Sequence, residues 1–161
     1  MKVIIIRTVE KNDGKLDVSD VTLLSAEEYE ASRDIIPKLK GGWWWLRSPG
    51  YFSYFATIVF NFGRVSTDVC FVNYSDGVVR PALSILNLKS LDLRPGDQII
   101  DFAGHDWTVI SDTMVLCNDG IGKHCFREDW EAPDANSYEA SAVKKYLQAW
   151  AAEKGLITAF K

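Results

Sequence analysis

This 161-residue sequence lacks a disulfide framework, a basic tract and any apolar run of membrane-spanning length. Its three cysteines include no CxxC pair and are too few for a disulfide-stapled secreted domain. The net charge is −4 without clustered Lys and Arg, which argues against nucleic acid as the main partner, because phosphate binding needs such clusters. The run Val3 to Ile6 is too short for a signal-peptide core. We therefore expect cytoplasmic synthesis without membrane insertion.

A second absence is local. Residues 51–75, YFSYFATIVFNFGRVSTDVCFVNYS, contain no Lys, Glu, Gln, Met or Trp, although these five types make up 29 of the 161 residues. Chance gives such a window in roughly one case in a hundred. The window instead holds five Phe and three Tyr. A buried sheet would exclude Lys, Glu and Gln, but it would tolerate Met and Trp. Composition alone leaves both a buried sheet and an exposed aromatic surface open.

Local patterns predict one α+β domain over residues 1–161. Ser25 precedes Glu28 by three residues, a capping-box spacing that predicts a helix ending before Pro37. A second helix is predicted near the C-terminal end, with an N-cap at Ser137 or Ser141 and Gly155 just past its last turn. Its apolar stripe consists of Val143, Tyr146, Leu147 and Trp150.

Strand-like runs occupy much of the remaining sequence. Strands are predicted at residues 2–8, 21–24, 98–102, 106–110, 113–117 and 123–127, with a strand or extended crossing at 85–91. Turns are predicted at Asp13-Gly14, Asp76-Gly77, Arg94 to Asp97 and Asp119-Gly120. The last four strands are expected to form a small antiparallel meander.

Two short motifs bracket the aromatic window. Trp43 to Gly50 read WWWLRSPG, and Val79 to Leu83 read VRPAL. These residues resemble a bacterial and phage domain family with a WWLRSPG start and a GVRPAL finish, which is similar to the C-type-lectin-fold variable proteins of diversity-generating retroelements. The phrases LLSAEEYE, PGDQIIDFAGHDWTVI and DANSYEAS are similar to the same group, so the resemblance covers most of residues 21–155.

The resemblance implies a C-type-lectin-like fold of two helices, short antiparallel sheets and a loop-rich display segment. Residues 43–83 would be the segment that resembles a variable region, and residues 94–155 would supply a β-meander and a helix packed on it. In the better-known variable proteins the diversified segment lies near the C-terminus, whereas about half of this chain follows it. A permuted or locally rearranged fold is therefore expected.

The resemblance also implies how the aromatic window arose. In such proteins an error-prone reverse transcriptase randomises adenines, mostly in AAC and AAT codons. Changes in the first two bases of these codons cannot produce Lys, Glu, Gln, Met or Trp, the five types missing here. Small or apolar landmarks are expected to stay fixed, and they are Ser53, Ala56, Val59, Gly63, Val65 and Val72.

Sixteen positions between the landmarks are the predicted ligand-binding, variable residues. They are Tyr51, Phe52, Tyr54, Phe55, Ile58, Phe60, Asn61, Phe62, Arg64, Ser66, Thr67, Asp68, Cys70, Phe71, Asn73 and Tyr74. The predicted scaffold residues are Trp43, Trp44, Trp45, Arg47 and Arg80. We expect at least two of the tryptophans in the core, and each arginine to bind a carboxylate or loop carbonyls.

The expected function is binding of an unknown protein or cell-surface ligand, without a catalytic residue, cofactor or metal. Homo-oligomer formation and display on a phage particle, or another form of export, stay open. The alternative is a phage or bacterial carbohydrate-binding or inhibitor module without diversification. The calcium-site triplets of C-type lectins are absent, so metal-independent binding is favoured.

An enzyme is the alternative from another class. His105-Asp106 offers an acid–base pair, and His124-Cys125 with Asp129 imitates a thiol nucleophile site. Neither group carries a supporting catalytic motif. Cys117, His124 and Cys125 also do not have the spacing of a zinc site.

Overall fold

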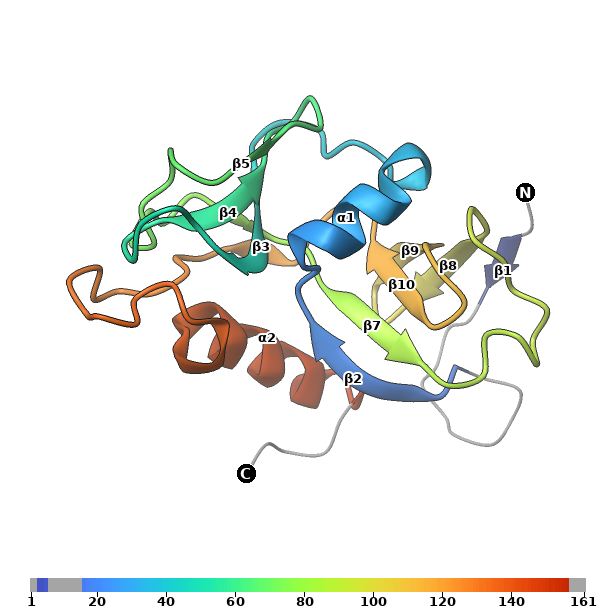
Figure 1. The fold of residues 1–161 in the computed structure, drawn as a ribbon. Helices are drawn as coiled ribbons and strands as arrows, with labels where there is room; N and C mark the ends of the chain where they lie inside the picture. Colours follow the sequence, from blue (N-terminus) through green and yellow to red (C-terminus); the bar gives the residue numbers. More distant parts are fainter. Residues whose placement is uncertain (1–2, 6–15, 157–161) are drawn as a thin grey trace.

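The computed structural model describes residues 3–5 and 16–156 and consists of two β-sheets and two α-helices (Figure 1). This arrangement confirms the predicted α+β class. Asp13-Gly14 and most of the strand predicted at residues 2–8 lie outside the described residues; within that strand, β1 (Val3–Ile5) is described.

The larger sheet has six strands and contains most of the predicted meander. Its order is β1, β8 (Gln98–Phe102), β9 (His105–Val109), β10 (Met114–Cys117), β7 (Ala82–Ile85) and β2 (Val18–Thr22). All neighbours are antiparallel except β1 and β8. The three successive strands β8, β9 and β10 agree with the sequence prediction to within a residue at each end.

The smaller sheet contains the tryptophan motif and the start of the second flanking motif, whose Ala82 and Leu83 lie in β7 of the larger sheet. Its order is β11 (Gly122–Lys123), β6 (Val78–Val79), β3 (Trp44–Pro49), β4 (Ala56–Val59) and β5 (Val65–Ser66). The pairing predicted for the fourth strand of the meander is therefore wrong, because β11 pairs with β6 rather than β10. The predicted strand at 85–91 is also wrong: β7 ends at Ile85 and turns follow.

Both predicted helices form with their predicted caps. Helix α1 (Ala26–Ser32) begins at a complete capping box between Ser25 and Glu28, and the short 3-10 helix η1 (Arg33–Ile35) follows it. Helix α2 (Ala142–Glu153) is capped by the Ser141 hydroxyl, follows the 3-10 helix η2 (Tyr138–Ala140) and lies beside β2. Gly155 has a φ of 71°, the left-handed conformation that ends helices at glycine.

The tryptophan motif lies in β3, which is buried on both faces. Trp45 belongs to the larger core cluster and packs edge-on against Phe126, with 5.6 Å between ring centroids. Trp44 belongs to the second cluster, where it contacts Tyr29 at 5.5 Å. Successive side chains of a strand point to opposite faces, so an apolar run without alternation is what a doubly buried strand requires. The expected burial of at least two tryptophans is confirmed.

Candidate functional site

The loops at the start of β4 form the outer surface of the aromatic window. Residues 50–55 and 67–74 lie side by side, because Tyr51 N–H donates to the Thr67 carbonyl at 2.8 Å and Val72 N–H donates to the Tyr54 carbonyl at 2.9 Å. Gly50 sits at their crossing, where an added Cβ would lie 2.6 Å from the Thr67 carbonyl oxygen. Only glycine fits this close approach.

Seven rings from these loops and one neighbouring loop form a continuous aromatic cluster, hereafter the aromatic cluster. Its members are Tyr51, Phe52, Tyr54, Phe55, Phe71, Tyr74 and Trp130, each within 6.3 Å of another ring. Tyr54 is central and stacks on both Phe52 and Phe71, at 5.5 and 5.1 Å. Offset stacked and edge-to-face contacts of this kind hold the rings in defined positions.

The aromatic cluster is open to solvent. Tyr51 is 75% exposed, Phe52 49%, Tyr74 42% and Trp130 41%, while the other three rings are half-buried. The summed exposed area of the four outer rings is roughly 400 Å², which matches the largest apolar patch on a typical monomer. The buried-sheet interpretation is therefore wrong for the outer rings of the window, which lie on exposed loops.

Trp130 was missed by the sequence prediction, because it lies 55 residues beyond the window. Its indole contacts Tyr54 and Phe71 edge-on, at 6.3 and 5.9 Å. The amide of Asn136, in the same loop, donates to the Phe52 carbonyl at 3.0 Å. Figure 1 shows this orange loop extending alongside the loops around β4. An isolated tryptophan among acidic residues is the only sequence signal that would have pointed to it.

The sixteen predicted binding positions divide by exposure. Nine are exposed, namely Tyr51, Phe52, Asn61, Phe62, Arg64, Thr67, Asp68, Asn73 and Tyr74. Five are half-buried, namely Tyr54, Phe55, Phe60, Ser66 and Phe71. Ile58 and Cys70 are 0% and 6% exposed, so neither is part of the outer surface. Ile58 lies within β4, a central strand whose four residues are all buried, and its side chain belongs to the larger core cluster.

The structure also divides these positions in space. Phe60, Asn61, Phe62 and Arg64 lie in the turn between β4 and β5, where Phe60 and Phe62 stack at 5.3 Å. Phe55 and Phe60 are separated by the length of β4, about 16 Å at 3.3 Å per residue. The fourteen exposed or half-buried positions therefore form two surfaces rather than one face, and only the surface formed by residues 50–55 and 67–74 contains the aromatic cluster.

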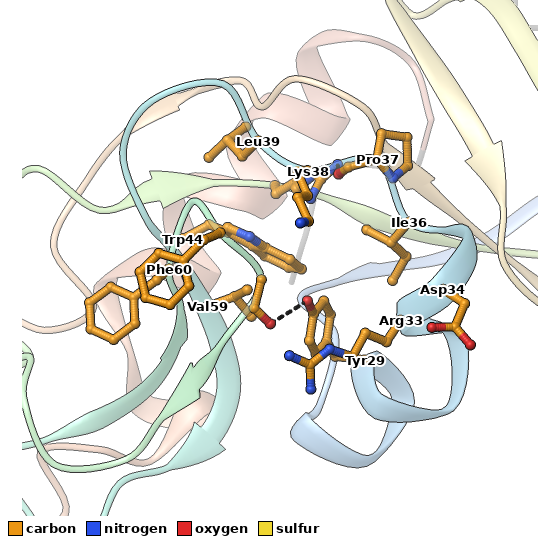
Figure 2. A pocket seen from close by; sticks show the side chains of 13 residues that line it. Tyr29, Arg33, Asp34, Ile36, Pro37, Lys38, Leu39, Trp44, Val59 and Phe60 are labelled. Carbon is orange, nitrogen blue, oxygen red and sulfur yellow. Dashed lines mark hydrogen bonds between the residues drawn. The ribbon is translucent and has the colours of Figure 1, made fainter.

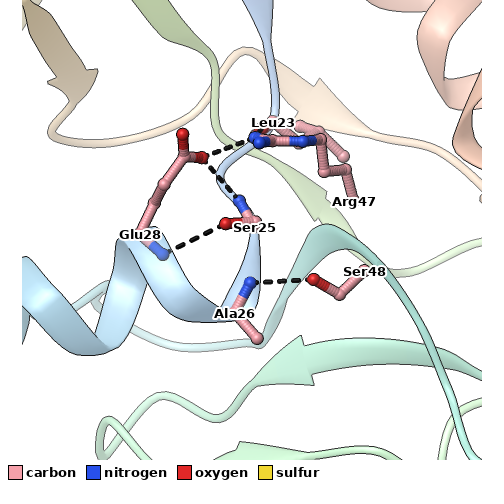
Figure 3. Close-up of polar contacts among 6 residues, drawn as sticks. All are labelled: Leu23, Ser25, Ala26, Glu28, Arg47 and Ser48. Carbon is pink, nitrogen blue, oxygen red and sulfur yellow. Dashed lines mark hydrogen bonds and ion pairs between the residues drawn. The ribbon is translucent and has the colours of Figure 1, made fainter.

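Arg47 ties the display segment to the first helix (Figure 3). Its guanidinium forms an ion pair with Glu28 and donates to the Leu23 carbonyl at 2.7 Å. The Ser48 hydroxyl accepts from Ala26 N–H at 2.9 Å. Burial raises the pKa of Glu28, but donors from Arg47 and the Ser25 backbone outweigh it, and the net pKa lies below the ordinary value. The expected carboxylate contact of Arg47 is present.

Arg80 also links separate segments through its guanidinium, but in the core, where it is 1% exposed. Its Nε donates to the Cys117 carbonyl at 2.7 Å, and Nη2 donates to the carbonyls of Pro37 and Asn118 at 2.6 and 3.1 Å. The guanidinium also lies over the Trp44 ring, 4.8 Å from its centroid. The expected binding of loop carbonyls is confirmed.

The histidine and cysteine groups considered for catalysis have ordinary structural contacts. His105 packs edge-on against Trp150, and burial lowers its pKa. His124 stacks on Tyr146 at 4.7 Å, and its Nδ1 lies 2.8 Å from the Cys125 carbonyl rather than a thiol. Burial raises the pKa of the Cys125 thiol, which is opposite to the shift that activates a nucleophilic cysteine.

Within residues 3–5 and 16–156, no group of three or more His, Cys, Asp and Glu side chains is placed to hold a metal ion. No helix among those residues has the length and apolar character needed to cross a membrane. The chain matches no family model, no curated protein and no solved structure.

Proposed function

We propose that this protein is a ligand-binding display protein that uses the aromatic cluster as its recognition surface. The observation that carries the proposal is the continuous set of seven rings, four of them at least 41% exposed, on loops anchored to a buried sheet. Tyrosine and phenylalanine offer large contact area with few torsions to order on binding. A surface of this size and rigidity suits a protein or cell-surface ligand.

We further propose that the exposed loop positions are diversified, as in the variable proteins of diversity-generating retroelements. Support comes from the five missing residue types and from the burial of four landmarks, Ala56, Val59, Gly63 and Val72. Buried landmarks hold the backbone while exposed neighbours vary without loss of the core. Ile58 and Cys70 are left out of this proposal because they face the core.

The fold proposed with this function is a rearranged C-type-lectin-like domain. The two helices, the mainly antiparallel sheets and the loop-rich segment between β3 and β6 support it. The rearrangement lies in the strands that follow the display segment, because β7, β8, β9 and β10 extend the larger sheet.

A charged rim adds a constraint on the ligand. Glu128, Asp129 and Glu131 are exposed around Trp130, and Arg127 pairs with Asp134 at 3.0 Å. Acidic groups beside exposed rings favour a ligand with Lys or Arg, which pairs with carboxylates and stacks on aromatic faces. A basic patch on a protein ligand therefore fits better than an acidic one.

A binding screen against purified cell-surface proteins and a glycan array tests the proposal. The test variant carries Ala at Tyr51, Phe52, Tyr74 and Trp130, and the matched control carries Ala at Ile35 and Leu86, which are exposed apolar residues elsewhere. We expect the test variant to fold and lose at least about tenfold in affinity, since exposed aromatic anchors dominate interfaces. Full binding by the folded test variant would contradict the proposal.

The diversification proposal has its own test. The codons of the fourteen remaining positions should end in C or T, and divergent isolates should differ at these positions while the landmarks stay constant. Identical residues across divergent isolates would remove this part of the proposal and leave ligand binding intact.

The alternative is a carbohydrate-binding or inhibitor module without diversification. Sugars bind to exposed aromatic rings and to hydrogen-bonding side chains. Tyr51 and Trp130 offer such rings, and the exposed amide of Asn73, next to Tyr74 in the sequence, offers hydrogen bonds. Binding on the glycan array alone, with constant loop residues among isolates, would favour this alternative.

A further inference from the structure

A cavity of about 320 Å³ lies at the other end of β4 from the aromatic cluster. It is enclosed by α1, the chain that follows η1, and the turn between β4 and β5 (Figure 2). Tyr29 forms part of its wall and donates a hydrogen bond from its hydroxyl to the Gly63 carbonyl at 2.8 Å. The side chains that matter for its chemistry are Tyr29, Lys38, Trp44, Phe60, Phe62 and Arg80.

Arg80 brings a buried cation to this cavity, and no carboxylate of the described residues forms an ion pair with it, although the nearby charge of Asp119 favours the protonated guanidinium. Its hydrogen-bond acceptors are three neutral carbonyls, and its charge also lies over the Trp44 ring. Nη1 is buried and has no hydrogen-bond partner among residues 3–5 and 16–156, although the other two guanidinium nitrogens do. An unpartnered buried donor is costly and rare, so such a group commonly marks the place of a ligand or ordered water.

The remaining charges around the cavity are also mainly positive. Arg33 and Lys38 line it together with Arg80, against the single carboxylate of Asp34. Arg33 is partly neutralised by Glu30 at 3.3 Å, which leaves Lys38 and Arg80 as the main cations. The protein as a whole carries a net charge of −4, so this positive lining is a local feature. Burial lowers the pKa of Arg80 to about 10, and the guanidinium therefore stays charged at neutral pH.

Apolar rings complete the lining. Phe60 and Phe62 are stacked with only 6° between their planes, and Phe62 is 59% exposed at the mouth of the cavity. Trp44 lies deeper, beside Val59 and Phe60 in Figure 2. The cavity thus combines a cationic interior with flat apolar walls. Its volume is at the lower end of the roughly 300–1,000 Å³ typical of ligand sites.

We propose that this cavity is a binding site for a small aromatic or planar carboxylate, with the carboxylate held by Lys38 and attracted by the buried positive charge of Arg80. The planar body of the ligand packs against the stacked rings of Phe60 and Phe62. The site goes beyond the proposed recognition surface, because its charged groups lie outside the sixteen predicted variable positions and it lies at the opposite end of β4. A cation that is already buried and fixed by three carbonyls is preorganised, so little reorganisation accompanies anion binding.

The first test is a titration of the ¹⁵N-labelled protein with phenylacetate, followed by NMR. Phenylacetate has about ten non-hydrogen atoms and fits the volume of the cavity. We expect saturable shifts in the millimolar range, concentrated at Tyr29, Lys38, Gly63 and the Trp44 indole. The neutral analogue phenylacetamide should bind at least about tenfold more weakly, because it carries no negative charge. Equal binding of the amide, or no saturation with phenylacetate, would overturn the proposal.

Matched variants locate the site. Lys38→Gln should weaken phenylacetate binding by about threefold, the size expected for one exposed charge, while Lys40→Gln removes the same charge two residues away and should leave binding unchanged. Both lysines are exposed, so both variants should fold. Equal weakening by the two variants would overturn the assignment. Tyr51→Ala, in the aromatic cluster, should not change phenylacetate binding, which separates this site from the proposed recognition surface.

Discussion

Replacing Arg80 by Met tests whether the buried guanidinium holds the core loops together. Methionine retains much of the side-chain length and its contact with Trp44, but it removes every donor to the carbonyls of Pro37, Cys117 and Asn118. These three carbonyls belong to the segment after η1 and to the end of β10, two segments that Arg80 joins to the start of β7. The variant therefore disconnects three segments without creating a large cavity.

The magnitude follows from the number of acceptors left without a donor. Each buried carbonyl that loses its partner costs about 1 kcal/mol, at the lower end of the usual range. The variant also no longer buries a charge, and the desolvation cost that this saves offsets part of the loss of the charge-assisted hydrogen bonds of Arg80. We expect Arg80→Met to lower the free energy of unfolding by about 3 kcal/mol, a large part of the roughly 5–15 kcal/mol typical of a domain.

Urea unfolding followed by tryptophan fluorescence measures this loss. With a slope of about 2 kcal/mol per molar urea, the midpoint should fall by about 1.5 M without a change in slope. Arg94→Met is the matched control, since Arg94 pairs with Asp92 at 3.6 Å on the surface and should cost less than about 0.5 kcal/mol. A loss of less than about 1 kcal/mol for Arg80→Met would refute the structural role assigned to Arg80.

Two further predictions concern the scaffold. The lowered pKa of Glu28 contributes stability that is present above its ordinary pKa and is lost as the pH falls through its folded value. In thermal unfolding, Glu28→Gln should therefore be less stable than the natural protein at pH 6 and equally stable near pH 3. A constant difference in stability across this range would contradict the assignment. In Gly77→Ala an added Cβ would lie 2.3 Å from Trp45 Nε1, which donates to the His124 carbonyl, so we expect a loss of about 1–3 kcal/mol in the free energy of unfolding. Unchanged urea stability of this variant would show that the turn shifts freely.

The helices were predictable because their signals are local. The capping box between Ser25 and Glu28 lies within one helical turn, and Ser141 contacts Lys144 N–H three residues away. The strands β8, β9 and β10 were also predictable, since short turns join antiparallel neighbours. By contrast, β11 leaves the meander and pairs with β6, more than 40 residues earlier in the chain. No local pattern carries information on that pairing.

The candidate site shows the same division. Residue types in the aromatic window left a buried sheet and exposed rings both open, and only the resemblance of the flanking motifs favoured exposure. The burial of Ile58 and Cys70 depends on which strands flank β4 and which loops cover it. The separation of Phe60 and Phe62 from the aromatic cluster follows from the hairpin between β4 and β5.

The sequence by itself therefore determined the α+β class, the caps, the buried tryptophans and an aromatic-rich segment that lacks Lys, Glu, Gln, Met and Trp. Each of these depends on residue type or on contacts within a few positions. Only the tertiary structure decided that Trp130 joins the aromatic cluster and that Arg80 lines a cavity with Lys38. Those contacts form between distant segments whose meeting is set by sheet pairing and core packing, and the energy of bringing them together comes from the whole fold rather than from either segment.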